Sequence, residues 1–194
     1  MRIALSGVTG SGKTTQLPII ADNFGYRPIK SASSIIEKQY NIKLASEDFN
    51  EEIQDEILDT QIMNELSLNK KSSFIADRSI LDILTYTIKY YSFIDHNWFN
   101  EYYKKLIKSY NYDIVFKFPS NILLNDSKYL ENFVIDNLLY SIIKHESESK
   151  HFKFIEIPLS IIKMGIEKTS EFIISCIESH ELRQHMIRKH KGKK

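Results

Sequence analysis

Gly7-Val8-Thr9-Gly10-Ser11-Gly12-Lys13-Thr14 follows the apolar run Ile3-Ala4-Leu5 near the start of a chain of 194 residues. The eight residues match the phosphate-binding loop G-x-x-x-x-G-K-[ST], and the apolar run supplies the strand that precedes such a loop. Its glycines let successive backbone N–H groups converge on phosphate oxygens at a helix N-terminus, whose dipole favours negative charge. The stretch therefore predicts a strand, a P-loop and a helix that bind a nucleoside triphosphate.

Within this loop the residue types predict separate roles. Lys13 is expected to reach the β- and γ-phosphates, and Thr14 to ligate Mg²⁺. A glycine-rich turn without a ligand is the alternative, and eight matching positions between a strand and a helix make it the weaker one. The predicted ATP-binding residues are Gly7, Val8, Thr9, Gly10, Ser11, Gly12, Lys13, Thr14 and Thr15.

Length and composition predict one domain over residues 1–194. The chain is 42% hydrophobic and 12% aromatic, which is enough for one buried core, and no Pro-, Gly- or Ser-rich linker divides it. No apolar run approaches the roughly 20 residues of a membrane span, and we expect neither a signal peptide nor a membrane partner. Cys176 is the only cysteine, so an internal disulfide is impossible, which fits a cytoplasmic protein.

The formal charge of +1 hides a basic C-terminal tail. Residues 183–194 contain six cations and no acid, leaving 20 cations against 25 acids in the remainder. Such a tail is able to contact nucleic acid or a substrate phosphate. A solvated, frayed end is the more frequent alternative.

Short apolar runs alternate with segments of helical periodicity along the whole chain. This alternation is typical of βαβ units, and it predicts an α/β fold with a parallel sheet. The predicted strands are 2–6, 26–30, 73–77, 113–118 and 152–157, and the predicted helices are 13–23, 47–68, 79–91, 97–109, 129–145 and 161–188.

An acid and a base stand together where the strand 73–77 ends. Because the carboxyl ends of parallel strands line the ligand crevice, Asp77 and Arg78 should face the same crevice as the P-loop. The Asp77 carboxylate is suited to hold Mg²⁺ or to orient an acceptor oxygen, and the Arg78 guanidinium to neutralise a transferring phosphoryl group. A surface ion pair at a strand end is the alternative.

The P-loop together with D-R-S-I-L-D-I-L-T-Y-T at 77–87 resembles the P-loop nucleoside and nucleotide kinases. That family includes thymidylate kinase, nicotinamide riboside kinase and phage kinases described as AAA-like ATPases, and the phage members are most similar. Residues 31–33, Gln54 and 112–116 resemble further segments of these kinases. The resemblance implies a three-layer P-loop kinase fold with a five-stranded parallel sheet flanked by helices, and Mg²⁺-ATP as donor.

The same resemblance implies roles for side chains outside the P-loop. The resemblance implies that Asp77 binds the metal or the acceptor and that Arg78 binds the phosphoryl group during its transfer. It also implies a lid at about 119–133. Lys128 is the only cation between residues 120 and 133, where similar kinases carry arginines, so it completes the expected catalytic set of Lys13, Asp77, Arg78 and Lys128. The expected metal ligands are Thr14 and Asp77, and the expected acceptor-binding residues are Ser33, Gln54, Arg78, Asp82 and Tyr86.

Two of these assignments have structural alternatives, and three functions stay open. Asp82 and Tyr86 are equally compatible with capping and core roles.

The first of the three open functions is a kinase of a free (deoxy)nucleoside or nucleotide, located in the host cytoplasm if phage-encoded. The second is a kinase of hydroxymethylated pyrimidine in DNA, which the basic tail and the serine at position 33 would suit. The third is a catalytically weak ATP-binding regulatory protein, and a homodimer is possible in each case.

Overall fold

A computed structural model describes residues 1–44, 50–66, 72–89, 94–120 and 129–191, with side chains omitted at 129, 190 and 191. Five parallel strands form one sheet in the order β2-β3-β1-β4-β5. The strands are β1 (Arg2–Ser6), β2 (Arg27–Ile29), β3 (Phe74–Asp77), β4 (Ile114–Lys117) and β5 (Lys153–Glu156). The predicted α/β class and five-stranded parallel sheet are therefore confirmed.

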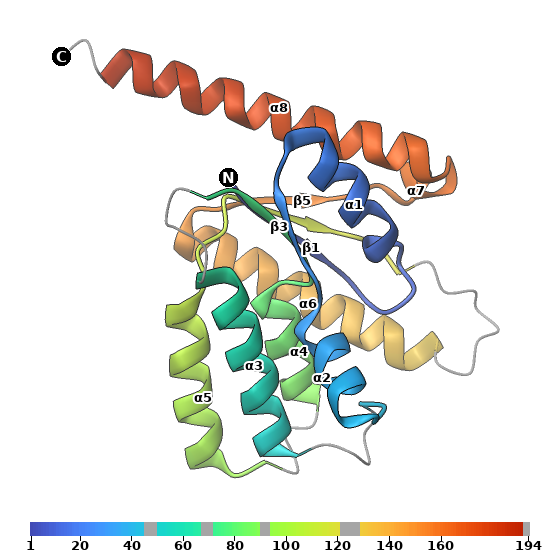
Figure 1. Cartoon of the computed structure of the whole chain (residues 1–194), viewed down its shortest axis with the longest axis vertical. Helices are drawn as coiled ribbons and strands as arrows, with labels where there is room; N and C mark the ends of the chain where they lie inside the picture. The colour runs from blue at the N-terminus through green and yellow to red at the C-terminus, as the bar shows by residue number, and fades with distance from the viewer. Residues whose placement is uncertain (45–49, 67–71, 90–93, 121–128, 192–194) are drawn as a thin grey trace.

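Helices cover both faces of this sheet (Figure 1). Those with described bounds are α1 (Lys13–Phe24), α2 (Ala32–Tyr40), α3 (Glu51–Leu66), α4 (Ile80–Lys89), α5 (His96–Ser109), α6 (Tyr129–Lys150), α7 (Leu159–Lys163) and α8 (Ile166–Lys191). The first and last of them, α1 and α8, pack on one face, and α2 to α6 pack on the other. The result is three layers.

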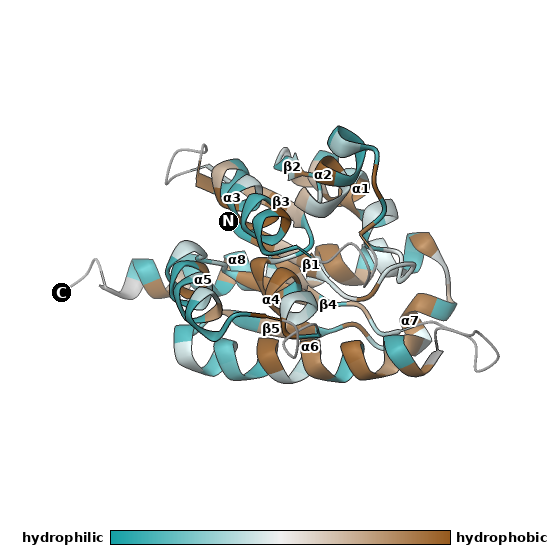
Figure 2. Cartoon of the chain, turned by 90° about the horizontal axis from the view of Figure 1, so that it is seen from below, coloured by the Kyte–Doolittle hydropathy of each residue, from teal (hydrophilic) through white to brown (hydrophobic). Residues whose placement is uncertain are grey.

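Alternation along the strands explains why two helical layers are needed. In β1, Ile3 and Leu5 contribute to the core beneath α1 and α8, whereas Ala4 between them contributes to the opposite core. Since successive strand residues point to opposite faces, a strand that is apolar throughout must be buried on both sides. The helix α4 is apolar along most of its length and lies among α3, α5 and α6 (Figure 2).

Four details differ from the sequence-based expectation. The helix α2 was not predicted, and the single helix expected at 161–188 is two helices, α7 and α8, separated by Gly165 at φ 101°. The helix α6 ends at Lys150 rather than at 145. Residues 129–133 of the expected lid belong to the first turns of α6, and Lys128 lies outside the described residues.

The amino ends of the strands form one side of the sheet, called here the amino edge, and their carboxyl ends form the opposite edge. The two edges carry different parts of the molecule. The P-loop connects the carboxyl end of β1 to α1, whereas the N-terminus and the last turns of α8 lie at the amino edge (Figure 1). Within the described ranges, no helix combines the length and apolarity that crossing a membrane requires.

Candidate active site

The P-loop has the backbone that its sequence predicts. Gly7, Gly10 and Gly12 adopt φ angles of 146°, 80° and 98°, which side chains strongly disfavour. A Cβ atom at Gly7 would lie 2.9 Å from the carbonyl oxygen of Phe118, whereas one at Gly10 or Gly12 would meet no atom within 4 Å. The glycine at position 7 is therefore required both by its conformation and by the close approach of β4's end.

Lys13 folds its ammonium group back over the P-loop. Its Nζ donates to the carbonyl oxygen of Val8 at 2.7 Å and to the hydroxyl of Ser11 at 3.0 Å. Burial, aided by the nearby positive charge of Arg78, lowers the pKa of Lys13 to about 8. The lysine thus lies inside the loop, where an anionic ligand would relieve the cost of its burial.

Thr14 and Asp77 come together from the two motifs. The Thr14 hydroxyl donates to Oδ2 of Asp77 at 2.7 Å, although the residues are 63 positions apart. Hydroxyl and carboxylate oxygens are the donors that Mg²⁺ prefers, usually beside water and substrate phosphate. The pair therefore fits a magnesium ion, and the expectation that the end of β3 faces the P-loop is confirmed.

Arg78 lies beside the P-loop, between Thr9 of the loop and Tyr86 of α4. Its Nη2 atom donates to the Thr9 hydroxyl at 3.1 Å, and its guanidinium carbon lies 5.1 Å from the ring centroid of Tyr86. Its backbone has φ 80°, a left-handed conformation that is uncommon for a residue with a long side chain. The Tyr86 ring and the Thr9 hydroxyl together fix the guanidinium beside the phosphate loop.

Asp82 lies beneath the P-loop rather than in an open pocket. It is fully buried, and its Oδ1 accepts from the Gly7 amide at 3.0 Å. Its Oδ2 accepts from the amide and the hydroxyl of Ser79 at 2.8 and 2.7 Å, while the Asp82 amide donates back to that hydroxyl. This reciprocal capping box is the structural alternative expected for Asp82, and a contact of Asp82 with the acceptor stays a prediction.

The other expected acceptor residues lie on α2 and α3. Gln54 is nearly buried, and its Oε1 accepts from the Thr87 hydroxyl at 3.3 Å. Ser33 shares a hydrogen bond with the hydroxyl of Ser31 at 2.8 Å. Among described residues, neither hydrogen-bonds to the P-loop, so their role in binding an acceptor stays a prediction.

A buried ion pair beside the P-loop was not predicted. Lys117 at the end of β4 is 1% exposed, and its Nζ lies 2.9 Å from Oδ2 of Asp136 on α6 and 3.3 Å from Oε1 of Glu156 on β5. The pair joins the two elements that flank the residues outside the described ranges, 121–128. Charge in an apolar strand was the sequence signal that could have located it.

Comparison with known proteins agrees with this geometry. A family model described as an AAA domain matches residues 2–161. The structure of deoxyadenosine kinase from M. mycoides with dCMP and dCDP is similar at a TM-score of 0.62 and 19% identity, covering 92% of this chain and 99% of that one. Thymidylate kinase from Ehrlichia chaffeensis is similar at a TM-score of 0.59 and 15% identity, with 91% and 98% covered.

A third structure extends the likeness to part of a longer protein. NadR in complex with NR is similar at a TM-score of 0.69 and 13% identity; the match covers 92% of this chain and 49% of the NadR chain. No curated protein matches this sequence. At these identities the structures establish a common P-loop kinase-like fold.

Proposed function

Since the chain belongs to this AAA-domain family and has a P-loop kinase-like fold, we propose that it is an ATP- and Mg²⁺-dependent kinase of a nucleoside or nucleotide. The observation that carries the proposal is the meeting of the Thr14 hydroxyl and the Asp77 carboxylate at 2.7 Å, beside Arg78. A P-loop without these side chains would be sufficient to bind a nucleotide but would not by itself indicate catalysis. A metal-ligating pair and a fixed guanidinium at the same loop suit phosphoryl transfer.

The donor side is assigned to the P-loop. Its backbone N–H groups and the Lys13 ammonium hold the phosphates, while Asp82 keeps Gly7 in place from below. Thr14 and Asp77 would hold Mg²⁺, which would neutralise charge on the phosphate oxygens. Fixed donors of this kind lower the barrier because they are already oriented when charge develops.

The transfer step needs little covalent chemistry from the protein. The acceptor hydroxyl forms a bond to the γ-phosphorus, the bond from that phosphorus to the bridging oxygen breaks, ADP leaves and the hydroxyl proton is released to water. Arg78 neutralises the transferring group, and Tyr86 holds its guanidinium at the site. The protein therefore contributes mainly position and charge.

The acceptor is assigned to the side of α2 and α3, where Ser33 and Gln54 lie. A nucleoside or nucleotide is supported by the fold, since the similar structures include deoxyadenosine kinase and thymidylate kinase. A serine cannot pair with an acceptor phosphate as an arginine does. Position 33 therefore favours an acceptor without a phosphate at that point.

The test is a phosphoryl-transfer screen with γ-labelled ATP against deoxynucleosides, their monophosphates and hydroxymethylated DNA. We expect transfer to one nucleoside or nucleotide class and at least a 100-fold loss of turnover in Lys13→Ala. Lys168→Ala is the matched control, because Lys168 pairs with Glu171 on an exposed helix surface. Tight ATP binding without transfer to any acceptor would replace the kinase by a regulatory ATP-binding protein.

DNA as the acceptor is the second candidate, and the position of the basic tail does not favour it. The end of α8 lies at the amino edge of the sheet, opposite the P-loop (Figure 1). DNA held by the described end of α8 would therefore contact the protein on the side of the sheet away from the P-loop. Transfer to hydroxymethylated DNA that fell on deletion of residues 181–194 would restore this candidate.

A further inference from the structure

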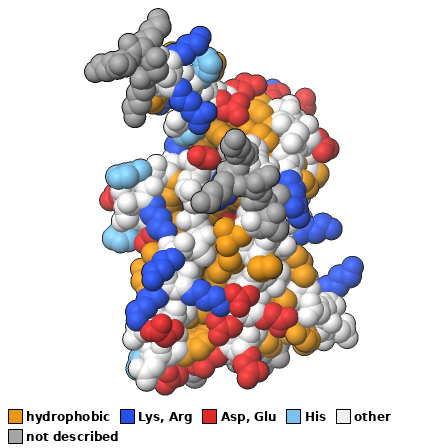
Figure 3. All heavy atoms as spheres, turned by 60° about the vertical axis from the view of Figure 1, so that its left-hand side comes forward, with side chains coloured by type: hydrophobic (Ala, Val, Ile, Leu, Met, Phe, Trp, Pro, Cys, Tyr) orange, Lys and Arg blue, Asp and Glu red, His pale blue; other side chains and the backbone are white. Residues whose placement is uncertain are grey.

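The last turns of α8 extend beyond the rest of the protein. Its earlier turns are anchored: Ile173 and Ile177 are fully buried, and Glu181 accepts a hydrogen bond from the Tyr26 hydroxyl at 2.6 Å. Every residue from 182 to 189 is exposed. We call this segment the arm. It spans about 12 Å at 1.5 Å per residue, and Figure 3 shows Lys and Arg side chains gathered on it.

The arm carries apolar side chains that the described part of the chain leaves largely exposed. Leu182 and Met186, one helical turn apart, are 65% and 57% exposed, and Ile187 is 48% exposed. A helical segment of this length gains most of its stability from packing rather than from intrinsic propensity. A contact outside the chain would therefore stabilise the arm.

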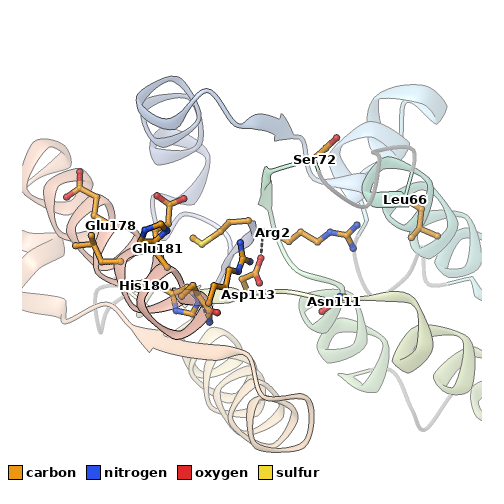
Figure 4. Close-up of a pocket in the computed structure, with 13 residues that line it drawn as sticks. Arg2, Leu66, Ser72, Asn111, Asp113, Glu178, His180 and Glu181 are labelled. Atoms are coloured by element: carbon orange, nitrogen blue, oxygen red, sulfur yellow. Dashed lines mark hydrogen bonds between the residues drawn. The ribbon is translucent and has the colours of Figure 1, made fainter. Parts of the chain in front are cut away.

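A groove runs between the arm and the amino edge of the sheet (Figure 4). Its volume is about 1300 Å³. Its wall on α8 includes Glu178 and Arg188, and the opposite wall includes Arg2, Leu66 and Asp113. Among the described residues, the groove is lined by α8 on one side and by residues near the amino ends of β1 and β4 on the other.

Charge changes sign along the side of α8 that lines this groove. Glu178 and Glu181 come first, followed by His185 and Arg188, at spacings of three and four residues that keep them on one side of the helix. Within the described part of the chain, neither Glu178 nor Arg188 forms an ion pair. The α8 side of the groove is thus acidic at one end and basic at the other.

We propose that the groove receives the arm of a second copy of this chain, with the two α8 helices antiparallel about a twofold axis near residue 183. This arrangement puts Arg188 opposite the partner's Glu178 and His185 opposite the partner's Glu181. The two Leu182 side chains meet near the axis, so one surface complements itself, as a twofold dimer requires. A parallel arrangement would place like charges opposite each other.

Nucleic acid fits the same groove less well. The cations of the arm attract phosphate, but Asp113, Glu178 and Glu181 line the groove with three carboxylates. The arm of a second copy brings cations to those carboxylates and apolar side chains to Leu66 and Leu182. A second copy therefore matches both the carboxylates and the apolar side chains that line the groove.

The experiment measures the mass of the full chain by sedimentation equilibrium. We expect a concentration-dependent dimer, and a dissociation constant at least tenfold higher in Glu178→Arg and in Arg188→Glu, because each homodimer then has two like-charged pairs. An equimolar mixture of these two variants should dimerise like the parent, because the heterodimer contains one reversed pair and one original pair. Glu167→Arg, the same change at an exposed position near the start of α8, should leave the dimer unchanged.

The outcomes that overturn the proposal are equally specific. They are a parent chain that stays monomeric at high concentration, single variants that dimerise like the parent, or a mixture that does not recover. The double variant Glu178→Arg/Arg188→Glu restores both pairs, with reversed charges, between two identical chains, and it replaces any single variant that fails to fold. Since the groove and the P-loop lie at opposite edges of the sheet, ATP binding should be unchanged in all of them, so failure here is separable from failure of the proposed kinase activity.

Discussion

Asp82 on α4 accepts a hydrogen bond from the backbone amide of Gly7 at 3.0 Å, across 75 residues of sequence. One carboxylate therefore joins the first residue of the P-loop to the first turn of a buried helix. The conformation of the phosphate loop depends on a residue that lies beneath it and is fully buried.

Asp82→Ala should destabilise the fold and weaken ATP binding together. The change leaves the Gly7 and Ser79 amides buried without their acceptor, which costs about 3 kcal/mol of unfolding free energy. Urea denaturation and ATP titration measure the two effects. Asp59→Ala, which removes an exposed carboxylate paired with Lys105, should cost less than about 1 kcal/mol. Equal losses of stability and of ATP affinity in the two variants would show that Asp82 does not position the P-loop.

Asp77→Asn should reduce turnover about 100-fold and raise the Mg²⁺ concentration needed for half-maximal activity. The amide keeps the size of the side chain but loses the negative charge that faces Thr14. Mg²⁺ titration at saturating ATP is the measurement. Asp22→Asn, at an exposed position on α1, is the control. Overlapping titrations of Asp77→Asn and the parent would assign Asp77 a structural role.

Tyr86→Leu should lower kcat by about 3- to 30-fold, the range of a cation–π contact worth roughly 0.5–2 kcal/mol. Leucine removes the ring over which the Arg78 guanidinium lies, whereas Tyr86→Phe keeps it. We therefore expect Tyr86→Phe to retain nearly full kcat. If instead the phenylalanine variant loses activity as the leucine variant does, the tyrosine hydroxyl contacts the substrate directly.

Glu65 should make the fold less stable as the pH rises. Burial raises the pKa of its carboxyl from 4.5 to about 7, although Gln61 and Tyr112 both donate hydrogen bonds to it. The folded protein keeps this proton to a higher pH than the unfolded chain, so Glu65's contribution to stability falls between about pH 4.5 and 7 and stays low above pH 7.

Glu65→Gln should remove that part of the pH dependence. The variant is then more stable than the parent at pH 8, by up to about 3 kcal/mol, and the difference shrinks toward pH 4.5. Urea denaturation across this range measures the difference. A variant that loses stability equally at every pH would show that Glu65 is charged in the folded protein throughout.

The pattern of apolar runs was sufficient for most of the fold. Ile3, Ala4 and Leu5 are apolar on both faces of β1, which indicates a strand covered on both sides, and the P-loop fixes the helix that follows. Propensity could not place α2, a helix of nine residues with only two buried side chains. Gly165 was overlooked as the break between α7 and α8, although a glycine at φ 101° ends a helix effectively.

The two motifs of the candidate site were predictable, and so was their proximity, because the carboxyl ends of parallel strands lie at one side of a sheet. The P-loop and the motif at Asp77 were found because each is a short run beside a strand. The bonds that join them, Thr14 to Asp77 and Gly7 to Asp82, connect residues far apart in the chain, and no periodicity encodes them. The packing of Lys117 against Asp136 and Glu156 likewise depends on three separate elements.

The left-handed backbone of Arg78 implies a conflict between the stability of the fold and the turnover of the proposed kinase. A residue other than glycine at φ 80° costs the folded state of order 1–3 kcal/mol when the surrounding structure forces it. Selection for heat resistance alone would therefore favour Arg78→Gly, which relieves the backbone and discards the guanidinium. Thermostable variants of this protein that are selected without an activity screen should accumulate substitutions at this position. They would have a more stable fold and a lower turnover.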